Sequence, residues 1–412
     1  MPTATHELSR RRFLAHAGLA PLAGALSGAC AAPSTPAPVP GVDMYARLGV
    51  EPLINAAGTY TALSASLMPV EVVAAMERAS RQFVSLHELH DAAGTHIASL
   101  VGAEAALVTA GSAAALTLAT AACVCGDDQE AIRQVPDTTG LKHRVILQRA
   151  HRFGYDHAIR NVGIELVDVE TREELEAAID EQTAMLFFLN VANDDGQIGR
   201  EEFAQIGTRT GIPTLIDAAA DLPPADNLRA FSAMGYDLVA FSGGKGLRGP
   251  QCSGLLLGRA DLIAAAYLNG SPHGNSIGRI AKVAKEEIVG LTRAVELYVE
   301  KDHEAEWREW EARVAAITDA VSDVPGITRA EPFVPRIANA VPHAAIEWDP
   351  AAIAMTRADV AAALRDGEPR IEARPSNDGA ARLEIGVWMM QPGDAQVVAA
   401  RCREILRGAS AA

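Results

Sequence analysis

Hydrophobic positions along the chain alternate between two patterns, and this alternation predicts an α/β fold. Short apolar runs of strand length lie at residues 105–109, 145–148, 183–189, 211–217, 238–241 and 254–257. Helical spacing of apolar residues lies at 69–84, 92–100, 113–122, 155–162, 280–300 and 302–321. The run at 183–189 is apolar on both faces, as in a parallel sheet that is covered on both sides. The pattern predicts a doubly wound sheet with its site at the strand ends.

Composition and charge fit a globular enzyme. Hydrophobic residues make up 49% of the chain and charged residues 21%, as in ordinary folded domains. We expect an N-terminal segment and large domain at residues 45–300, followed by a smaller α+β domain at 301–412. The net charge of −16 argues against binding nucleic acid. The few cysteines form neither a disulfide framework nor a zinc pattern, and we expect no metal.

The first residues have the pattern of an export signal. Paired arginines at 10–12 precede an uncharged, Gly- and Ala-rich run at 15–29 and the Pro-rich stretch 33–40. This pattern is typical of a twin-arginine signal, and an ordinary amphipathic helix would not explain the paired arginines. We expect a signal peptide at 1–31, a linker at 32–44 and a periplasmic protein. Cys30 fits either a lipid anchor or a small-residue cleavage site, and both interpretations remain open.

A lysine stands in a Gly-rich turn between the two apolar runs 238–241 and 254–257. Such a turn partly removes the Lys245 ammonium from water, which lowers the pKa of a lysine toward nucleophilic use. The alternative is a solvated surface lysine. The turn is not a Walker loop, because that motif needs Ser or Thr directly after the lysine and Gly246 stands there.

Two further stretches complete the components of a cofactor site. Asp217 ends the apolar run 211–217, and a buried carboxylate needs a cation or a hydrogen-bond donor. Gly111, Ser112 and Ala113 lie where the run 105–109 turns into a helix, and such a helix start holds phosphate groups. A phosphate site, a carboxylate for a pyridinium nitrogen and a Schiff-base lysine are the parts of a pyridoxal 5′-phosphate (PLP) site.

Three segments carry a resemblance to a known family: residues 54–61, 108–116 and 241–251. They resemble the selenocysteine synthase-like group of fold-type I PLP enzymes, and most of all its D-glucosaminate-6-phosphate ammonia-lyase-type members. The similarity extends from Tyr45 to the C-terminus. True selenocysteine synthases carry Asp where this chain has Gly244, and they have an additional N-terminal tRNA-binding domain. Both differences argue against a role with tRNA.

The resemblance implies a fold and further site residues. The fold is a large domain with a mostly parallel, seven-stranded sheet and a smaller α+β domain, assembled as a homodimer or larger homo-oligomer. His151 would stack on the cofactor ring, with Tyr155 and His157 as rivals, and Asn190 and Ser242 would lie near the cofactor. Arg279 would reach the phosphate of a second subunit, unless it is merely an exposed loop residue.

The resemblance also implies substrate contacts. Asn55 and Thr59 would face the substrate, although turn formation is an alternative role for both. Arg374, in preference to Arg370, would bind a substrate carboxylate through its planar guanidinium.

The favoured reaction is an α,β-elimination that releases ammonia from an amino acid or amino-sugar acid. Lys245 would remove the α-proton, and Asp217 would keep the ring nitrogen protonated. β-Replacement or transamination is an alternative within the enzyme class. A non-catalytic, exported cofactor-binding protein is an alternative of another class.

Overall fold

The computed structural model describes residues 42–374 and 381–410. The chain divides into two units, residues 1–51 and 52–412, and each is described by itself. The described part of the first unit holds the short helix α1 (Met44–Leu48), whose N-terminus is capped by Asp43. The expected signal peptide, most of the linker and Cys30 lie outside the described residues.

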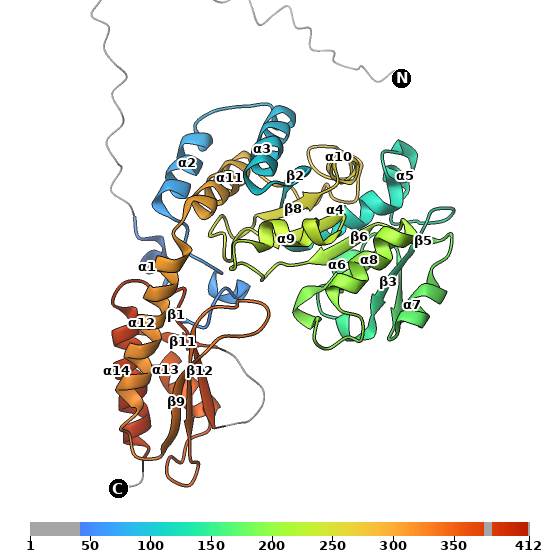
Figure 1. The fold of residues 1–412 in the computed structure, drawn as a ribbon. Coiled ribbons are helices and arrows are strands. Elements are labelled where there is room, and N and C mark those ends of the chain that lie inside the picture. The colour runs from blue at the N-terminus through green and yellow to red at the C-terminus, as the bar shows by residue number, and fades with distance from the viewer. Residues whose placement is uncertain (1–41, 375–380, 411–412) are drawn as a thin grey trace, which may run out of the picture. The chain divides into compact units, whose positions relative to one another are not determined.

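A seven-stranded sheet forms the centre of the larger region of the second unit (Figure 1). Its strand order is β2-β8-β7-β6-β5-β3-β4. The strands are β2 (Ala105–Thr109), β3 (Arg144–Gln148), β4 (Glu165–Val169), β5 (Thr183–Leu189), β6 (Thr214–Asp217), β7 (Leu238–Ser242) and β8 (Gly254–Gly258). Only β8 runs antiparallel to its neighbours. All seven residues of β5 are buried, because helices cover both faces.

Two hydrophobic layers enclose this sheet. One face packs mainly against α3 (Leu86–Val101), α8 (Arg200–Thr210), α9 (Asn227–Met234) and α11 (Lys285–Glu300). The other packs mainly against α4 (Ser112–Cys125), α5 (Gln129–Gln134), α6 (Asp156–Arg160) and α10 (Ala260–Leu268). The remaining helices of this region are α2 (Val70–Ser80), which packs on α11, and α7 (Arg172–Ala178), which packs on β4. The α/β class, with its mostly parallel seven-stranded sheet, is confirmed.

A smaller α+β region follows and has a hydrophobic core of its own. Its antiparallel sheet has the order β12-β10-β9. Its elements are α12 (His303–Val321), β9 (Ile327–Phe333), β10 (His343–Trp348), α13 (Arg357–Arg365), β11 (Ile371–Ala373), β12 (Arg382–Gly386) and α14 (Asp394–Gly408).

The start of the N-terminal segment pairs with this smaller region. Strand β1 (Ile54–Ala56) pairs in parallel with β11, with Ile54 opposite Ile371. Local patterns cannot reveal a pairing between residues so far apart in the chain. The domain bounds expected from the sequence, with an N-terminal segment and large domain at 45–300, do not include this connection. None of the helices in the described residues is both long and apolar enough to span a membrane.

Candidate active site

The sheet topology brings the predicted cofactor residues to one edge. Because β2 and β7 are both antiparallel to β8, they run parallel to each other and to β6 and β5. The segments that follow these four strands therefore emerge at the same edge. The phosphate loop follows β2, Lys245 follows β7, Asp217 ends β6 and Asn190 follows β5.

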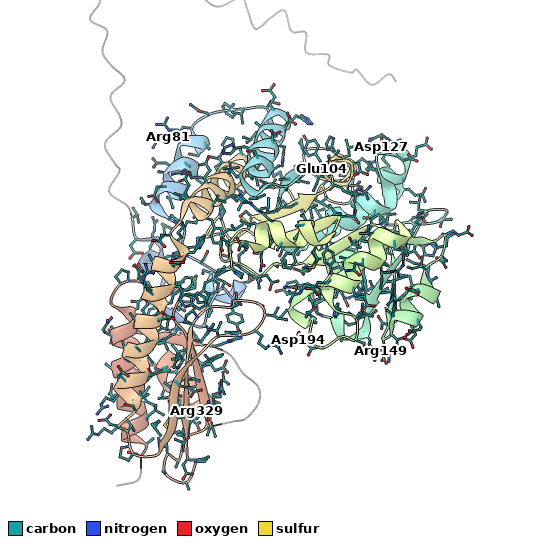
Figure 2. The ribbon with its side chains drawn as sticks, viewed as in Figure 1. Arg81, Glu104, Asp127, Arg149, Asp194 and Arg329 are labelled. Carbon is teal, nitrogen blue, oxygen red and sulfur yellow. The ribbon has the colours of Figure 1, made fainter. Side chains whose placement is uncertain are left out.

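A cavity of about 290 Å³ lies at this edge. Six predicted residues line it: Gly111, Ser112, Ala113, Asp217, Ser242 and Lys245. Apolar and aromatic side chains form much of the remaining wall, namely Leu116, Phe153, Tyr155, Leu189 and Val191. Many charged residues instead lie on the outside, such as Arg81, Glu104 and Asp127 in Figure 2. The cavity thus combines apolar walls with a few polar groups, as cofactor sites usually do.

The lysine turn is held by close backbone packing. A Cβ at Gly244 would lie 2.5 Å from the Cα of Gln251, so the position directly before Lys245 has no room for a side chain. Gly at this position is therefore required by the packing of the turn against Gln251. Burial lowers the pKa of Lys245, while Asp217 and then Asp221 raise it. The amine is therefore easier to deprotonate than an exposed lysine.

Asp217 is buried without a charged partner among the described residues. Its side chain is 6% exposed, and its Oδ1 accepts one hydrogen bond, from the Ala219 N–H at 2.9 Å. Burial raises the pKa of this carboxyl to about 6, against the opposing effects of that hydrogen bond and of Lys245. A carboxylate in this position is stabilised by a cation brought into the cavity.

The phosphate loop is shaped by a close approach to β8. Gly111 precedes α4 with φ +89°, a conformation that favours glycine. A Cβ at Gly254 would lie 2.3 Å from the carbonyl carbon of Gly111 and 2.7 Å from the amide nitrogen of Ser112. The first turn of a helix leaves backbone N–H groups without intrahelical partners, and here this turn borders the cavity. These N–H groups and the helix dipole suit a phosphate.

The residues present therefore fit PLP. The N–H groups at the start of α4 would hold its phosphate, Asp217 would pair with its protonated ring nitrogen and Lys245 would bond its aldehyde carbon. The buried Asp217 carboxyl is the observation that tests this fit: it accepts one hydrogen bond and forms no ion pair among the described residues, and a pyridinium would supply an adjacent cation. PLP provides a sink for negative charge that develops on a substrate carbon.

A second carboxylate, which sequence reasoning did not single out, also lines the cavity. Asp221 follows Asp217 by four residues and is 5% exposed. Asn190, which was expected near the cofactor, is buried and is not among the residues that line the cavity. Its Oδ1 accepts a hydrogen bond from Arg200 Nη1 at 2.7 Å. The signal available in the sequence was a second Asp one helical turn after a strand-end Asp, but its burial depends on residues far along the chain.

The ring at the cavity wall is not that of His151. His151 is fully buried, and its Nδ1 accepts a hydrogen bond from the Leu189 N–H at 3.2 Å. His151 ends the short 3₁₀ turn η3 (Arg149–His151). Its side chain packs edge-on against Phe188 of β5. Phe153 and Tyr155 line the cavity instead.

The N-terminal segment reaches the cavity through Thr61, not through the two residues expected there. Asn55 closes a local turn, because its Oδ1 accepts hydrogen bonds from the N–H groups of Ala57 and Gly58. Thr59 is buried, and its hydroxyl contacts Asn339 Oδ1 at 3.4 Å. Thr61 lines the cavity, and its carbonyl accepts a hydrogen bond from Gln251 Nε2 at 3.0 Å.

Neither of the two predicted arginines is among the described residues that line the cavity. Arg374 follows β11 and lies 3.6 Å from the carboxylate of Glu384. Arg279 is exposed in the loop that precedes α11. Their proposed roles therefore remain predictions.

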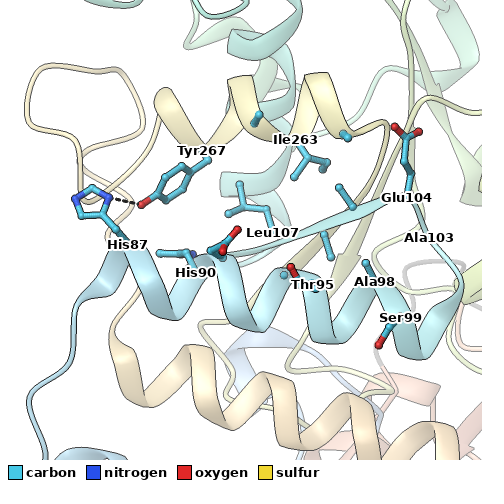
Figure 3. A pocket seen from close by; sticks show the side chains of 16 residues that line it. His87, His90, Thr95, Ala98, Ser99, Ala103, Glu104, Leu107, Ile263 and Tyr267 are labelled. Atoms are coloured by element: carbon cyan, nitrogen blue, oxygen red, sulfur yellow. Dashed lines mark hydrogen bonds between the residues drawn. The ribbon is translucent and has the colours of Figure 1, made fainter.

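A second cavity, of about 440 Å³, lies between α3, α10 and the edge strand β2 (Figure 3). His87 Nδ1 and the Tyr267 hydroxyl are 2.6 Å apart at one end of it. Burial, followed by the influence of His87 and His273, lowers the pKa of His90 to about 4. No lysine and none of the predicted site residues line this cavity, so the PLP chemistry belongs to the smaller one.

Comparison with known proteins supports this assignment. Residues 53–309 match the family of L-seryl-tRNA selenium transferase (SelA). D-glucosaminate-6-phosphate ammonia lyase of Salmonella typhimurium (strain 14028s / SGSC 2262) is 30% identical over 384 residues, covering 89% of this chain and 99% of that protein. A 5′-C-glycyluridine monooxygenase-decarboxylase of a Streptomyces species is 30% identical, with 88% and 92% covered.

The solved structures agree with the sequence relatives. A structure of D-glucosaminate-6-phosphate ammonia-lyase superimposes with a TM-score of 0.77 at 29% identity, covering 89% of this chain and 99% of that one. A structure of serine palmitoyltransferase from S. paucimobilis with a PLP compound bound superimposes with a TM-score of 0.55 at 14% identity. The match covers 87% of this chain and 88% of that one. The latter likeness concerns the fold alone.

Fold and site together define a PLP-dependent enzyme of fold type I. Since the family match covers more than half of its length, the chain belongs to the L-seryl-tRNA selenium transferase family. The expected family, cofactor and enzyme class are thereby confirmed.

Proposed function

We propose that this protein is an ammonia lyase that eliminates a β-leaving group from an amino acid or amino-sugar acid. The observation that carries the proposal is the joint placement of Lys245 and Asp217 at one cavity. The Salmonella relative, which is named as an ammonia lyase and is similar over nearly the whole chain, supports the same reaction class. This chemistry needs neither a second substrate nor an oxidant.

Lys245 and Asp217 have different roles in the proposed reaction. Lys245, whose pKa is lowered by burial, takes the proton from the substrate's Cα. Asp217 would hold a proton on the ring nitrogen of bound PLP, and the cofactor would then supply a strong electron acceptor. The apolar wall excludes water from the reacting carbon. The released enamine then hydrolyses to a keto acid and ammonia.

The test separates elimination from the alternative reactions. The PLP-loaded enzyme is incubated with a panel of D- and L-β-hydroxy amino acids and amino-sugar acids, with and without a keto acid, in air and anaerobically. We expect ammonia without a keto acid and equally without oxygen. Turnover only with a keto acid would indicate an aminotransferase, and turnover only in air would indicate an oxygen-dependent enzyme like the Streptomyces relative.

A homo-oligomer is also proposed, on two observations. Among the described residues that line the cavity, Lys245 is the only cation, although a bound phosphate would carry two negative charges. Phe83 and Ile280 are 104% and 91% exposed, and a second subunit that packs on this face would cover them. Arg279 stands next to Ile280 and would then face the second subunit's phosphate. Arg279→Ala should weaken PLP binding without changing the monomer fold, as measured by PLP titration and circular dichroism.

We further propose export through the twin-arginine pathway, which the arginines at 10–12 support. Replacing Arg10 and Arg11 with lysine should leave folded, yellow protein in the cytoplasm. Continued appearance in the periplasm would refute this route. Mass spectrometry of the exported protein would decide between a lipid on Cys30 and plain cleavage.

A further inference from the structure

The active-site cavity contains two buried carboxyl groups, and the proposed chemistry has so far used only one. Asp217 would pair with the cofactor ring. Asp221 lies in the loop after β6 and lines the same cavity as Lys245. A nearly buried carboxyl group that faces a reaction cavity, outside any ion pair of the described residues, is a candidate for acid–base work.

Asp221 is held in place from three directions. The N–H of Ala338, from the smaller region, donates to its Oδ1 at 3.2 Å. Its backbone carbonyl accepts a hydrogen bond from Asn227 Nδ2 at 2.7 Å. Asn339 N–H donates to the neighbouring Ala220 carbonyl at 2.7 Å. The carboxyl group is thus fixed between the large and small regions, where the N-terminal segment also reaches the cavity.

The charges around Asp221 do not force it to ionise. Burial raises the pKa of its carboxyl above the ordinary value, while the Asn190 amide, Ala338 N–H, Arg200 and Lys245 act in the opposite direction with smaller effect. Asp217, the other acidic group of the cavity, disfavours a second negative charge. The group therefore keeps its proton to a higher pH than an exposed aspartic acid.

We propose that Asp221 is the general acid that protonates the leaving group on the substrate's Cβ. The assignment rests on the proposed elimination. Lys245 takes the Cα proton, the electron pair of that C–H bond forms the Cα–Cβ double bond, and the Cβ–O bond breaks with its electron pair on oxygen. The Asp221 proton passes to that oxygen, so that hydroxide leaves as water. Asp221 ends ionised and Lys245 protonated, and proton transfer through solvent restores both.

An acid is needed because hydroxide is a poor leaving group. A positioned general acid typically contributes about 10² to 10⁴ in rate. The rival arrangement is that Lys245, once protonated, returns its proton to the leaving oxygen and acts alone. The two arrangements differ for the hydroxy substrate: without the Asp221 carboxyl, its rate falls if Asp221 is the acid and stays unchanged if Lys245 acts alone. A leaving group that needs no proton is the control, because neither arrangement predicts a loss there.

The experiment compares leaving groups in the PLP-loaded enzyme and its Asp221→Asn, Asp221→Ala and Asp221→Glu variants. The substrates are the most active β-hydroxy compound of the panel and β-chloroalanine, whose chloride leaves without a proton. Asp226→Asn, an exposed position five residues along the same loop, is the matched control. Ammonia release, solvent-deuterium exchange at Cα and the visible absorption of bound PLP are measured for each protein.

We expect Asp221→Asn to release ammonia from the hydroxy substrate about 100-fold or more slowly, but from β-chloroalanine at nearly the wild-type rate. PLP absorption and Cα exchange should persist, and Asp221→Glu should regain part of the lost rate. In the wild type, only the hydroxy substrate should lose rate as rising pH deprotonates the acid, whose pKa burial raises. Equal losses on both substrates, or loss of bound PLP in both Asn and Glu variants, would overturn the assignment and indicate a structural role. Wild-type enzyme that releases ammonia from neither substrate would instead overturn the elimination itself.

Discussion

Replacing Asp217 by Asn should make the PLP-free protein more stable at neutral pH while it weakens the holoenzyme. Burial raises the pKa of Asp217 from 3.8 to about 6. A shift of about two units corresponds to about 3 kcal/mol between the two protonation states. The pKa is higher in the folded state than in the unfolded state. The stability that the protonated Asp217 carboxyl contributes is therefore fully present below pH 4 and is lost as the pH rises through 6.

Asn cannot ionise, yet its side-chain oxygen can still accept the Ala219 N–H. The Asp217→Asn apoprotein should therefore match the wild type at pH 4 and exceed it by up to about 3 kcal/mol at pH 8. With PLP bound the order should reverse, because the variant lacks the carboxylate that pairs with the ring nitrogen.

Urea unfolding at pH 4, 6 and 8, at one fixed protein concentration, measures this difference from the transition midpoint and slope. Asp226→Asn, at an exposed position, is the control and should show no such pH-dependent gain. A gain of the same size at pH 4 and pH 8, or a loss at pH 8, would refute the reasoning that burial makes the ionised form of Asp217 destabilising.

Two further substitutions test the shape of the cavity. Gly254→Ala should displace the phosphate loop, because its Cβ would meet Gly111 at 2.3 Å, and so raise the Kd for PLP at least 10-fold in an absorbance titration. Gly274→Ala, where nothing lies within 4 Å of the added Cβ, should leave the Kd unchanged, and equal effects would contradict this. His151→Ala should lower the unfolding free energy by about 2–4 kcal/mol, because it opens a cavity and leaves a buried N–H unpaired, yet retain PLP. Phe153→Ala should weaken PLP binding instead, and the reverse pattern would restore His151 to the cofactor.

Local sequence patterns were sufficient to predict those site residues that stand at the ends of strands. Lys245, Asp217 and Gly111 each stand where an apolar run meets a turn, and the common direction of the strands brings such positions together. Their placement at one cavity therefore follows from a fold class that the sequence indicates.

Other features depend on contacts that no local pattern records. His151 and Phe153 are two residues apart, and only the 3₁₀ turn at the end of β3 decides which ring faces the cavity. The burial of Asp221 depends on Ala338, 117 residues away. Likewise, β1 finds its partner in β11 across most of the chain.

The central claim is that PLP is carried on Lys245, and one measurement tests it most directly. The purified protein is loaded with PLP, reduced with borohydride and digested, and the peptides are mapped by mass spectrometry. We predict a visible absorption band that reduction abolishes, and one modified peptide with the reduced cofactor on Lys245. A protein that stays colourless with excess PLP, or that carries the label on another lysine, would contradict the account.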